Sequence, residues 1–146
     1  MINNTLFRGK NLKGQWVEGS LFNGINYFDN EKATFILYND PKIDSRGCTV
    51  NYSGEPVDPE TVSQWTGLTD KNGVKIFGGD ILGFMDSWGE ERISGVVEYG
   101  VFNCSCCDGV YGWQIKGGDI RDLEGNTWLY VKGNIWDNPE LVGEKL

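Results

Sequence analysis

Residues 57–82 read VDPETVSQWTGLTDKNGVKIFGGDIL and hold the most ordered run of turn and strand signals in the chain. Asp58, Pro59 and the following Glu suit the first turn of a helix, so we expect one α-helical or 3₁₀ turn there. The apolar runs that follow predict short strands, at residues 62–66, 74–77 and 81–84. The stretch contains no nucleophile–base pair, phosphate loop or set of metal ligands. The stretch therefore predicts how the backbone folds and does not indicate a catalytic site.

Glycine, Asn and Asp separate these predicted strands. Asn72-Gly73 closes a loop over residues 67–73, and Gly78-Gly79-Asp80 bends the backbone before the third strand. Glycine adopts positive φ without steric cost, and Asp accepts hydrogen bonds from nearby main-chain N–H groups. The same three residues, Gly-Gly-Asp, recur at positions 117–119. Neither copy opens a long helix, so both are interpreted as bends between strands rather than phosphate cradles.

Residues 6–28 predict a β-meander. Asn23-Gly24 is the strongest two-residue hairpin signal in this region, because both central positions of a type I′ turn require positive φ. A strand is expected at residues 25–28, directly after that turn, and another at residues 33–38. From residue 39 to residue 59 the strand signal weakens and proline and glycine recur.

That weak region is the predicted boundary between two parts of the chain. We expect an N-terminal β-rich region over residues 1–56 and a C-terminal barrel domain over residues 57–146. A long loop over one shared core is the alternative.

The C-terminal third continues the strand pattern. Strands are predicted at residues 93–99, 111–115 and 128–131, and Asn138-Pro139-Glu140 predicts the start of a short helix. Glycine makes up 21 of the 146 residues without a strict three-residue repeat, which is typical of short strands joined by tight turns. The expected fold class is therefore mainly β, with a minor helical contribution and a small, strongly curved barrel.

Net charge and composition limit the partners and the cellular compartment that we expect for this protein. The net charge is −8, so the chain lacks the clustered basic residues that binding to a nucleic-acid phosphate backbone requires. The chain also has no histidine, which is the commonest general base. A nucleic-acid partner is therefore not expected. Residues 1–5 lack the basic start of a signal peptide, and no apolar run approaches the ~20 residues of a membrane span. We expect a cytoplasmic protein without a membrane partner, whose four cysteines stay reduced.

Three stretches together resemble the YopX family of phage and prophage proteins: LFRGKNLKGQWVEGSLF, VDPETVSQWTGLTDKNGVKIFGGDIL and VKGNIWDNPELV. The resemblance implies a mainly β or α+β protein whose C-terminal part is an SH3-like barrel. It also implies a phage or prophage origin, a bacterial host cytoplasm and a tendency to self-associate. It implies no activity and no catalytic or cofactor-binding residues.

The positions that carry this resemblance are mostly ones that a turn demands. We therefore interpret the shared pattern as a structural turn motif that sets the backbone conformation. Its members are Asp58, Pro59, Gly67, Asn72, Gly73, Gly79, Asp80, Gly133, Asn134 and Pro139.

The cysteines invite a metal or redox interpretation. Cys104, Cys106 and Cys107 lie close together, and Cys48 is a distant fourth candidate ligand. A tetrahedral zinc site usually takes its ligands from two well-spaced pairs, whereas Cys106 and Cys107 are adjacent and no CxxC pair is present. The competing interpretation is a strand end with free thiols, so no metal or cofactor is expected.

Asp80 and the aromatic residues are the remaining candidates for a site. As a catalytic carboxylate, Asp80 would need a second carboxyl group within roughly 5–10 Å, and the sequence shows no such arrangement. An Asp that accepts hydrogen bonds within its own turn is the commoner case. Most aromatic residues are expected in the core, since each buries ~150–250 Å². Trp88, in the polar segment MDSWGEER, is the expected exposed aromatic.

These observations favour a phage or prophage accessory protein without enzymatic activity. We expect it to act through protein–protein contacts, as a homo-oligomer and with an unidentified host or phage protein. One alternative is a small enzyme that uses carboxylates near Asp80. Another is a nucleic-acid-associated SH3-like module, since fold alone does not decide function.

Overall fold

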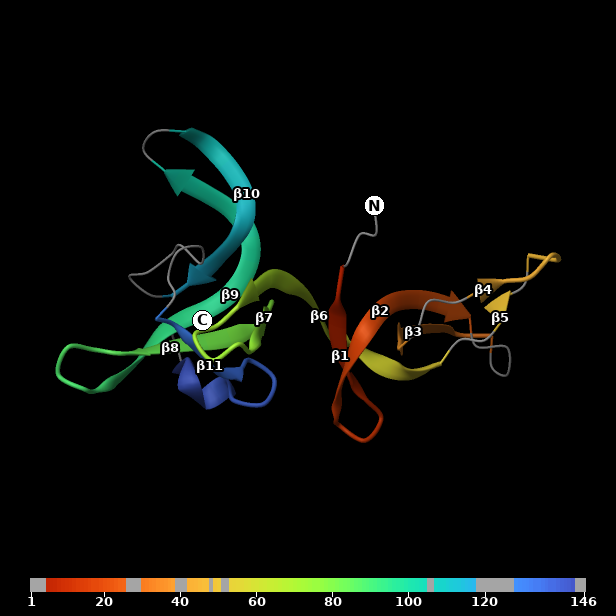
Figure 1. Ribbon diagram of the computed structural model, residues 1–146, viewed down its shortest axis with the longest axis horizontal. Coiled ribbons are helices and arrows are strands. Elements are labelled where there is room, and N and C mark those ends of the chain that lie inside the picture. The colour runs from red at the N-terminus through yellow and green to blue at the C-terminus, as the bar shows by residue number, and fades with distance from the viewer. Residues whose placement is uncertain are drawn as a thin grey trace. The chain divides into compact units, whose positions relative to one another are not determined.

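The computed structural model describes residues 5–25, 30–38, 42–47, 49–50, 53–104, 107–117 and 128–143. Two compact units divide the chain, Met1–Trp65 and Thr66–Leu146. Strands dominate both units, and helical structure in the described part of the chain is limited to one 3₁₀ turn, η1 (Pro139–Leu141) (Figure 1). The predicted mainly β class with a small barrel is confirmed. Whether residues 1–56 and 57–146 fold as separate domains stays a prediction.

Unit 1 is built from four long antiparallel strands and a short two-stranded sheet. The long strands follow the order β1-β2-β3-β6, and β6 also pairs with β1, which closes the ring. A closed ring has no free edge strand. The strands are β1 (Phe7–Asn11), β2 (Trp16–Ile25), β3 (Lys32–Leu37) and β6 (Gly54–Thr69), with β4 (Lys42–Ile43) paired to β5 (Thr49–Val50).

Strands β2 and β3 approach closely at Gly19, where the β2–β3 pairing begins. A Cβ atom added to Gly19 would lie 2.0 Å from the main-chain oxygen of Leu37, so only glycine fits there. Ile36 and Leu37 are buried, as is Val57 on β6. The small barrel therefore has a tightly packed aliphatic interior, and this packing requires a residue without a side chain at position 19.

The helical turn predicted at residues 58–61 is wrong, because β6 runs through these residues as a bulged strand. Register partners jump from Arg8↔Ser63 to Lys10↔Asp58, so β6 carries extra residues opposite β1. Pro59 lies in this bulge, where a missing N–H costs no ladder bond. The side-chain oxygen of Thr61 accepts a hydrogen bond from the Lys10 N–H at 2.8 Å, which replaces a ladder partner.

The Asn23-Gly24 hairpin prediction is also wrong. Strand β2 continues through both residues, with Asn23 opposite Thr34 and Gly24 opposite Ala33. Pairing with β3 holds this segment extended and overrides the local turn preference. Of the strand predicted at residues 25–28, Ile25 is the last residue of β2, and residues 26–29 lie outside the described part of the chain.

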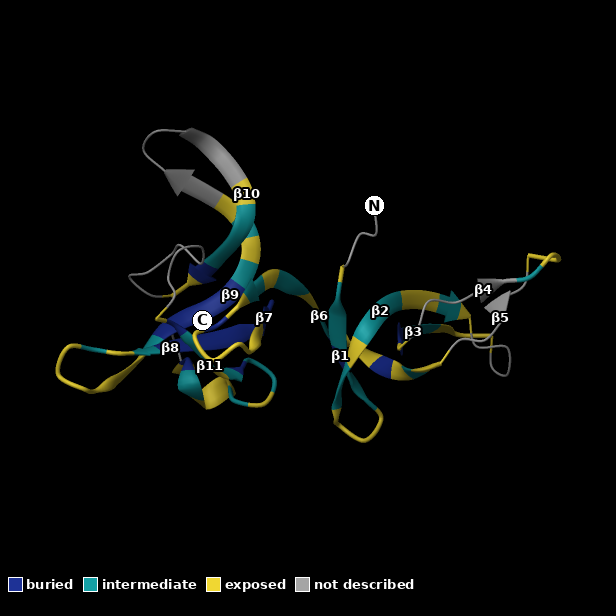
Figure 2. Cartoon of the chain, viewed as in Figure 1, coloured by how far each residue is buried: buried dark blue, intermediate teal, exposed yellow. Residues whose placement is uncertain are grey.

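Unit 2 is an antiparallel sheet with strand order β10-β9-β8-β11, and β7 pairs with the end of β6. Its main core cluster contains Ile76, Leu82, Val97, Ile115 and Leu129. Figure 2 shows the buried residues concentrated in β7, β8 and the first half of β9. The strands are β7 (Lys75–Phe77), β8 (Asp80–Met85), β9 (Glu91–Cys104), β10 (Cys107–Lys116) and β11 (Tyr130–Asn134).

These strands overlap the ones predicted at residues 74–77, 81–84, 93–99, 111–115 and 128–131. η1 begins at Pro139, where the sequence predicts a short helix. Asn138 does not cap η1 with its side chain; its Oδ1 atom instead accepts a hydrogen bond from the Asn134 N–H at 3.3 Å.

Substituting Gly19 with Ala should test the close approach of β2 and β3 in unit 1. The added methyl group would overlap the Leu37 carbonyl, so we expect a loss of about 1–3 kcal/mol in the free energy of unfolding. Chemical denaturation checks this, with Ser20→Ala on the same strand as the control. Equal stability of Gly19→Ala and the control would show that the ring is looser than described.

Candidate functional site

Four loops of the molecule share one framework, with Asn or Asp at the first position and glycine at the fourth. In three of them the Oδ1 atom of the first residue accepts hydrogen bonds from the N–H groups two and four residues later, at 2.8–3.0 Å. The fourth-position glycines have φ between 76° and 80°. The loops begin at Asn11, Asp44, Asp70 and Asp86, and end with Gly14, Gly47, Gly73 and Gly89.

The Asx-x-x-Gly spacing was a signal available in the sequence, but only Asn72-Gly73 was singled out from it. In that loop Asp70 is the residue that makes the side-chain bonds, to the N–H groups of Asn72 and Val74. Its second oxygen accepts a hydrogen bond from the Val131 N–H at 2.9 Å. Asp70 therefore ties the loop to β11 and is a structural residue.

Trp88 occupies the third position of the Asp86 loop, between β8 and β9, and is 83% exposed. The loop is held by the carboxylate of Asp86, which also forms an ion pair with Arg92 at 3.0 Å. The N–H of Glu90, and then Arg92 and the N–H of Trp88, lower the pKa of Asp86 below its ordinary value. The indole is thus presented to solvent on a loop whose backbone is fixed.

The turn itself does not require tryptophan. The corresponding third residues of the other loops are Lys13, Arg46 and Asn72, all polar. The indole of Trp88 therefore contributes little to the stability of the loop. A binding role for Trp88 stays a prediction.

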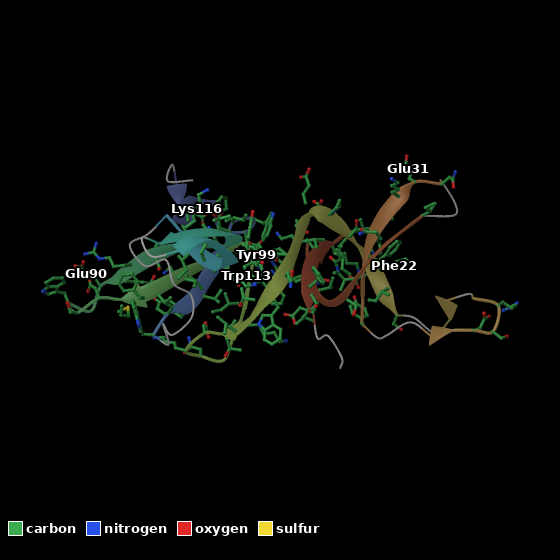
Figure 3. All side chains as sticks on the ribbon, turned by 90° about the horizontal axis from the view of Figure 1, so that it is seen from above. Phe22, Glu31, Glu90, Tyr99, Trp113 and Lys116 are labelled. Carbon is green, nitrogen blue, oxygen red and sulfur yellow. The ribbon has the colours of Figure 1, made fainter. Side chains whose placement is uncertain are left out.

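A second exposed group of aromatic side chains lies on β9 and β10, which extend beyond the sheet as a two-stranded ribbon (Figure 1). We call Tyr99, Val101, Tyr111 and Trp113 the aromatic strip. Register places Tyr99 opposite Trp113 and Val101 opposite Tyr111. The rings of Tyr99 and Trp113, both labelled in Figure 3, meet edge to face at 5.4 Å. Tyr99 also stacks on Tyr111 at 6.5 Å.

The aromatic strip continues the core face of the sheet into solvent. The next pair along the same face, Val97 and Ile115, is buried, because it packs in the core cluster with Ile76 and Leu129. Strand β8 pairs with β9 only from Glu91 to Val96. Beyond that point Tyr99 is 61% exposed and Tyr111 is 69% exposed.

The part of the opposite face that lies nearest to the sheet, around Glu98 and Gln114, is polar. Gln114 donates a hydrogen bond to Glu98 at 3.4 Å, and Lys116 lies 3.9 Å from the same carboxylate. Gly100 and Gly112 face each other across the strands. This inner part of the ribbon is therefore amphipathic, and Tyr99 and Tyr111 on its apolar face are exposed among the described residues.

Asp80 is buried at 1% exposure and bonds within its own corner. Its Oδ2 atom accepts a hydrogen bond from the Phe77 N–H at 2.8 Å. Gly79, with φ 84°, donates to the Val97 oxygen and accepts from the Ile135 N–H. Its α-carbon packs so closely on Trp136 that a Cβ atom would lie 2.5 Å from the indole. This Gly-Gly-Asp corner is a packing element, and Asp80 lines neither hollow described below.

The remaining motif positions lie in β6, in β11 and at the corner after β11, and a common turn role for them stays a prediction. Gly67 has φ 88°, and a Cβ atom on Gly133 would lie 2.3 Å from the Oδ1 atom of Asn138. Asn134 accepts hydrogen bonds from the N–H groups of Trp136 and Asp137. Asp58 accepts one from the Glu60 N–H at 3.0 Å.

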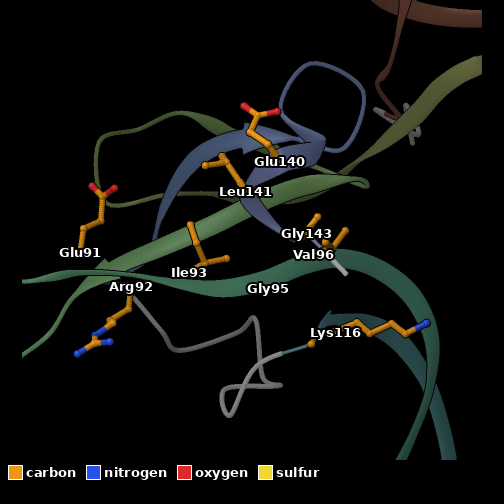
Figure 4. A pocket seen from close by; sticks show the side chains of 11 residues that line it. Glu91, Arg92, Ile93, Gly95, Val96, Lys116, Glu140, Leu141 and Gly143 are labelled. Carbon is orange, nitrogen blue, oxygen red and sulfur yellow. The ribbon is translucent and has the colours of Figure 1, made fainter. Parts of the chain in front are cut away.

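Unit 2 contains a hollow of about 700 Å³ between β9, the end of β10 and η1 (Figure 4). Ile93, Val96 and Leu141 supply its apolar lining. Most of its charged groups are engaged within the chain: Arg92 with Asp86 and Glu90, Glu91 with Lys132 and Tyr130, and Lys116 with Glu98. These pairs do not form the converging acid and base that a hydrolytic site requires.

A smaller hollow of about 290 Å³ lies in unit 1 beside Glu55. The Glu55 carboxylate accepts hydrogen bonds from the Tyr38 hydroxyl and the Asn11 amide. The Tyr38 bond is the main cause that lowers the pKa of Glu55, and the same bond raises the pKa of Tyr38. Glu55 belongs to β6 and Asn11 is the last residue of β1, so the bond between them links β6 to the β1–β2 loop.

The cysteine prediction falls largely outside the described residues. Cys104 and Cys107 are register partners at the end of the β9–β10 ribbon. Cys48 and Cys106, and the side chains of Cys104 and Cys107, lie outside the description. No group of three His, Cys, Asp or Glu side chains placed to hold a metal occurs among the residues that the structure describes. A cysteine metal site therefore stays untested.

Fold and surface together define a two-unit β protein with a pre-formed set of turns and an exposed aromatic strip. The YopX protein family matches residues 6–143, and the chain belongs to this family. A crystal structure of protein EF1440 from Enterococcus faecalis is similar at 24% sequence identity, with 94% of this chain and 97% of that chain covered and a TM-score of 0.46. No curated protein matches the chain. Within the described residues, no helix is long and apolar enough to cross a membrane.

Replacing Trp88 with Asn should leave the melting temperature unchanged, because Asn72 occupies the same position in the Asp70 loop. Replacing Asp86 with Ala should lower it by a few degrees, because two main-chain N–H groups and Arg92 lose their acceptor. Thermal unfolding followed by circular dichroism checks both variants. A large loss of stability in Trp88→Asn would make the indole a structural group.

The lowered pKa of Asp86 predicts a pH dependence. A carboxylate with a depressed folded-state pKa contributes stability above its unfolded pKa, and this contribution disappears as pH falls through the folded value. The melting temperatures of wild type and Asp86→Asn should therefore differ most near pH 7, begin to converge at about pH 4, and meet only when the pH has fallen through the lower folded-state pKa. Thermal scans at pH 7 and at a series of acid pH values measure the difference, and a gap that widens in acid would contradict the assignment.

Proposed function

We propose that this protein is a phage- or prophage-derived accessory protein without enzymatic activity. It works by protein–protein contact in the bacterial host cytoplasm, and it self-associates through the aromatic strip. Membership of the YopX family supports the class. The observation that carries the contact function is the run of exposed aromatic side chains on the β9–β10 ribbon.

The aromatic strip is a favourable contact surface for physical reasons. Aromatic side chains bury 150–250 Å² each and dominate interface energetics. The outer ribbon has only two strands, and a two-stranded hairpin is marginally stable alone in water. A covering partner would bury the strip and stabilise the ribbon at once. Because the strip residues are neutral, this surface avoids the repulsion that a net charge of −8 otherwise imposes between copies.

Trp88 supplies a second contact, for a host or phage protein. The Asp86 loop fixes the backbone around Trp88, so the entropy lost on binding is small. Acidic residues flank the indole at positions 86, 90 and 91. A complementary partner would offer an apolar socket with a basic rim.

The self-association proposal is tested by sizing. Tyr99→Ser combined with Tyr111→Ser should convert an oligomer into a monomer at tens of micromolar, because it removes the two most exposed rings of the strip. Light scattering after gel filtration measures the mass. Leu12→Ser is the matched control, since Leu12 is 87% exposed on a loop of unit 1. A monomeric wild-type protein at this concentration would refute self-association.

A further inference from the structure

Two Asn-Gly pairs occur in the sequence, Asn23-Gly24 and Asn72-Gly73, and the structure places them in different surroundings. Asparagine is thermolabile, because the main-chain nitrogen of the next residue can displace its side-chain amide. Glycine as the next residue favours this reaction, since it has no Cβ atom to hinder the attacking nitrogen. The reactivity of each pair therefore depends on its backbone and on the space around it.

Asn23-Gly24 is protected by its strand. Both residues belong to β2 and pair with β3, where Asn23 lies opposite Thr34. The Thr34 hydroxyl donates a hydrogen bond to the Oδ1 atom of Asn23 at 3.0 Å. The space beside Gly24 is filled, because a Cβ atom there would lie 2.7 Å from the ring of Phe22. The nitrogen of Gly24 can therefore reach the Cγ atom of Asn23 only after this part of the sheet opens.

Asn72-Gly73 lies at the exposed tip of the Asp70 loop. The main-chain N–H of Asn72 donates to Asp70, whereas its side-chain amide makes no hydrogen bond with any described residue. A Cβ atom on Gly73 would meet no atom within 4 Å, so the space around the attacking nitrogen is open. The N–H of Gly73 donates to the Asp70 main-chain oxygen at 3.0 Å, and this bond must open before the nitrogen reacts. Opening one bond at a loop tip costs less than opening a paired strand.

We propose that Asn72 is a site of spontaneous deamidation, with water as the co-reactant. The nitrogen of Gly73 loses its proton to solvent and forms a bond to the Cγ atom of Asn72. The bond from Cγ to Nδ2 breaks, and the side-chain amide leaves as ammonia. Water then opens the cyclic succinimide at either carbonyl group. Opening at Cγ gives aspartate, and opening at the main-chain carbonyl gives isoaspartate, in which the chain runs through the former side chain.

Isoaspartate at position 72 would disturb the contact between the Asp70 loop and β11. It adds one carbon atom to the main chain, inside a loop whose bonds depend on residue spacing. The Oδ1 atom of Asp70 accepts from the N–H groups of Asn72 and Val74, at 2.8 and 2.9 Å, and its Oδ2 atom accepts from the Val131 N–H at 2.9 Å. Strand β11 lies at one end of the described four-stranded sheet. Displacing the carboxylate would leave an N–H group of this edge strand without its acceptor.

Ageing of the purified protein tests the site. After incubation at mildly alkaline pH and physiological temperature, peptide mapping by mass spectrometry measures deamidation at each asparagine. Asn72 should react about tenfold faster than Asn23 or more, because the strand must open before Asn23 can react. In the matched variant Asn72→Gln, whose longer side chain cyclises far more slowly, the change at position 72 should disappear and the rate at Asn23 should stay the same. Equal rates at Asn23 and Asn72 in the wild type, or a faster reaction at Asn23, would overturn the assignment.

Hydrogen exchange tests the structural consequence. The amide of Val131 should exchange faster in aged wild-type protein than in fresh protein, as Asp70 loses its position. Asn72→Asp carries the charge of the deamidated residue on a normal backbone, so its Val131 amide should exchange as in fresh wild type. Labelling by an isoaspartate methyltransferase shows which product has formed. Unchanged exchange at Val131 in aged protein that contains isoaspartate would overturn the effect on β11, and so would equally fast exchange in Asn72→Asp.

Discussion

The constraint on which this structure depends is the supply of acceptors for main-chain N–H groups at sharp bends. Such groups cost free energy when they lose water without gaining a partner. Asp and Asn side chains provide the acceptors in three five-residue loops, and Asp80 and Asn134 do so at two further corners. The short strands can reverse within a few residues because these bonds are made locally, and the glycines supply the positive φ that the loops require.

Much of this framework could be predicted from the sequence, because turn chemistry is local. Gly73, Gly79 and Asp80 were recognisable as bend residues, and the apolar runs marked most strands. Two errors arose where a partner strand overrides a local preference. Pro59 suits a helix start, yet the bulge in β6 accommodates it and Thr61 replaces a ladder acceptor. Asn23-Gly24 suits a tight turn, yet pairing with β3 keeps both residues extended.

The exposure of Trp88 could be predicted from the sequence, whereas the exposure of the aromatic strip could not, because the first depends on local residues and the second on tertiary packing. Trp88 stands alone among polar neighbours, so its exposure was readable from the sequence. The aromatic strip was not, because Tyr99 and Trp113 alternate with polar residues as in any half-buried strand. The exposure of Tyr99 depends on where the core cluster ends along β9, and Trp113 lies at that boundary, packed against the cluster; this is a tertiary fact. The ring closure of unit 1 likewise depends on long-range pairing between β1 and β6.

The acidic residues hold the turns in place, and this role bears on the proposed contact function. The chain has 21 acidic residues, an abundance that by itself would suit carboxylate chemistry. Asp70, Asp80 and Asp86 instead accept main-chain N–H groups, and Glu55, Glu91 and Glu98 are held by Tyr, Lys or amide donors. Acids held in this way stiffen loops and ribbons, and a stiff surface loses less entropy when it binds. The bonds of Asp86 therefore fix the loop that carries Trp88, and the contacts of Glu98 lie on the ribbon that carries the aromatic strip; the proposed contact function would use this rigidity.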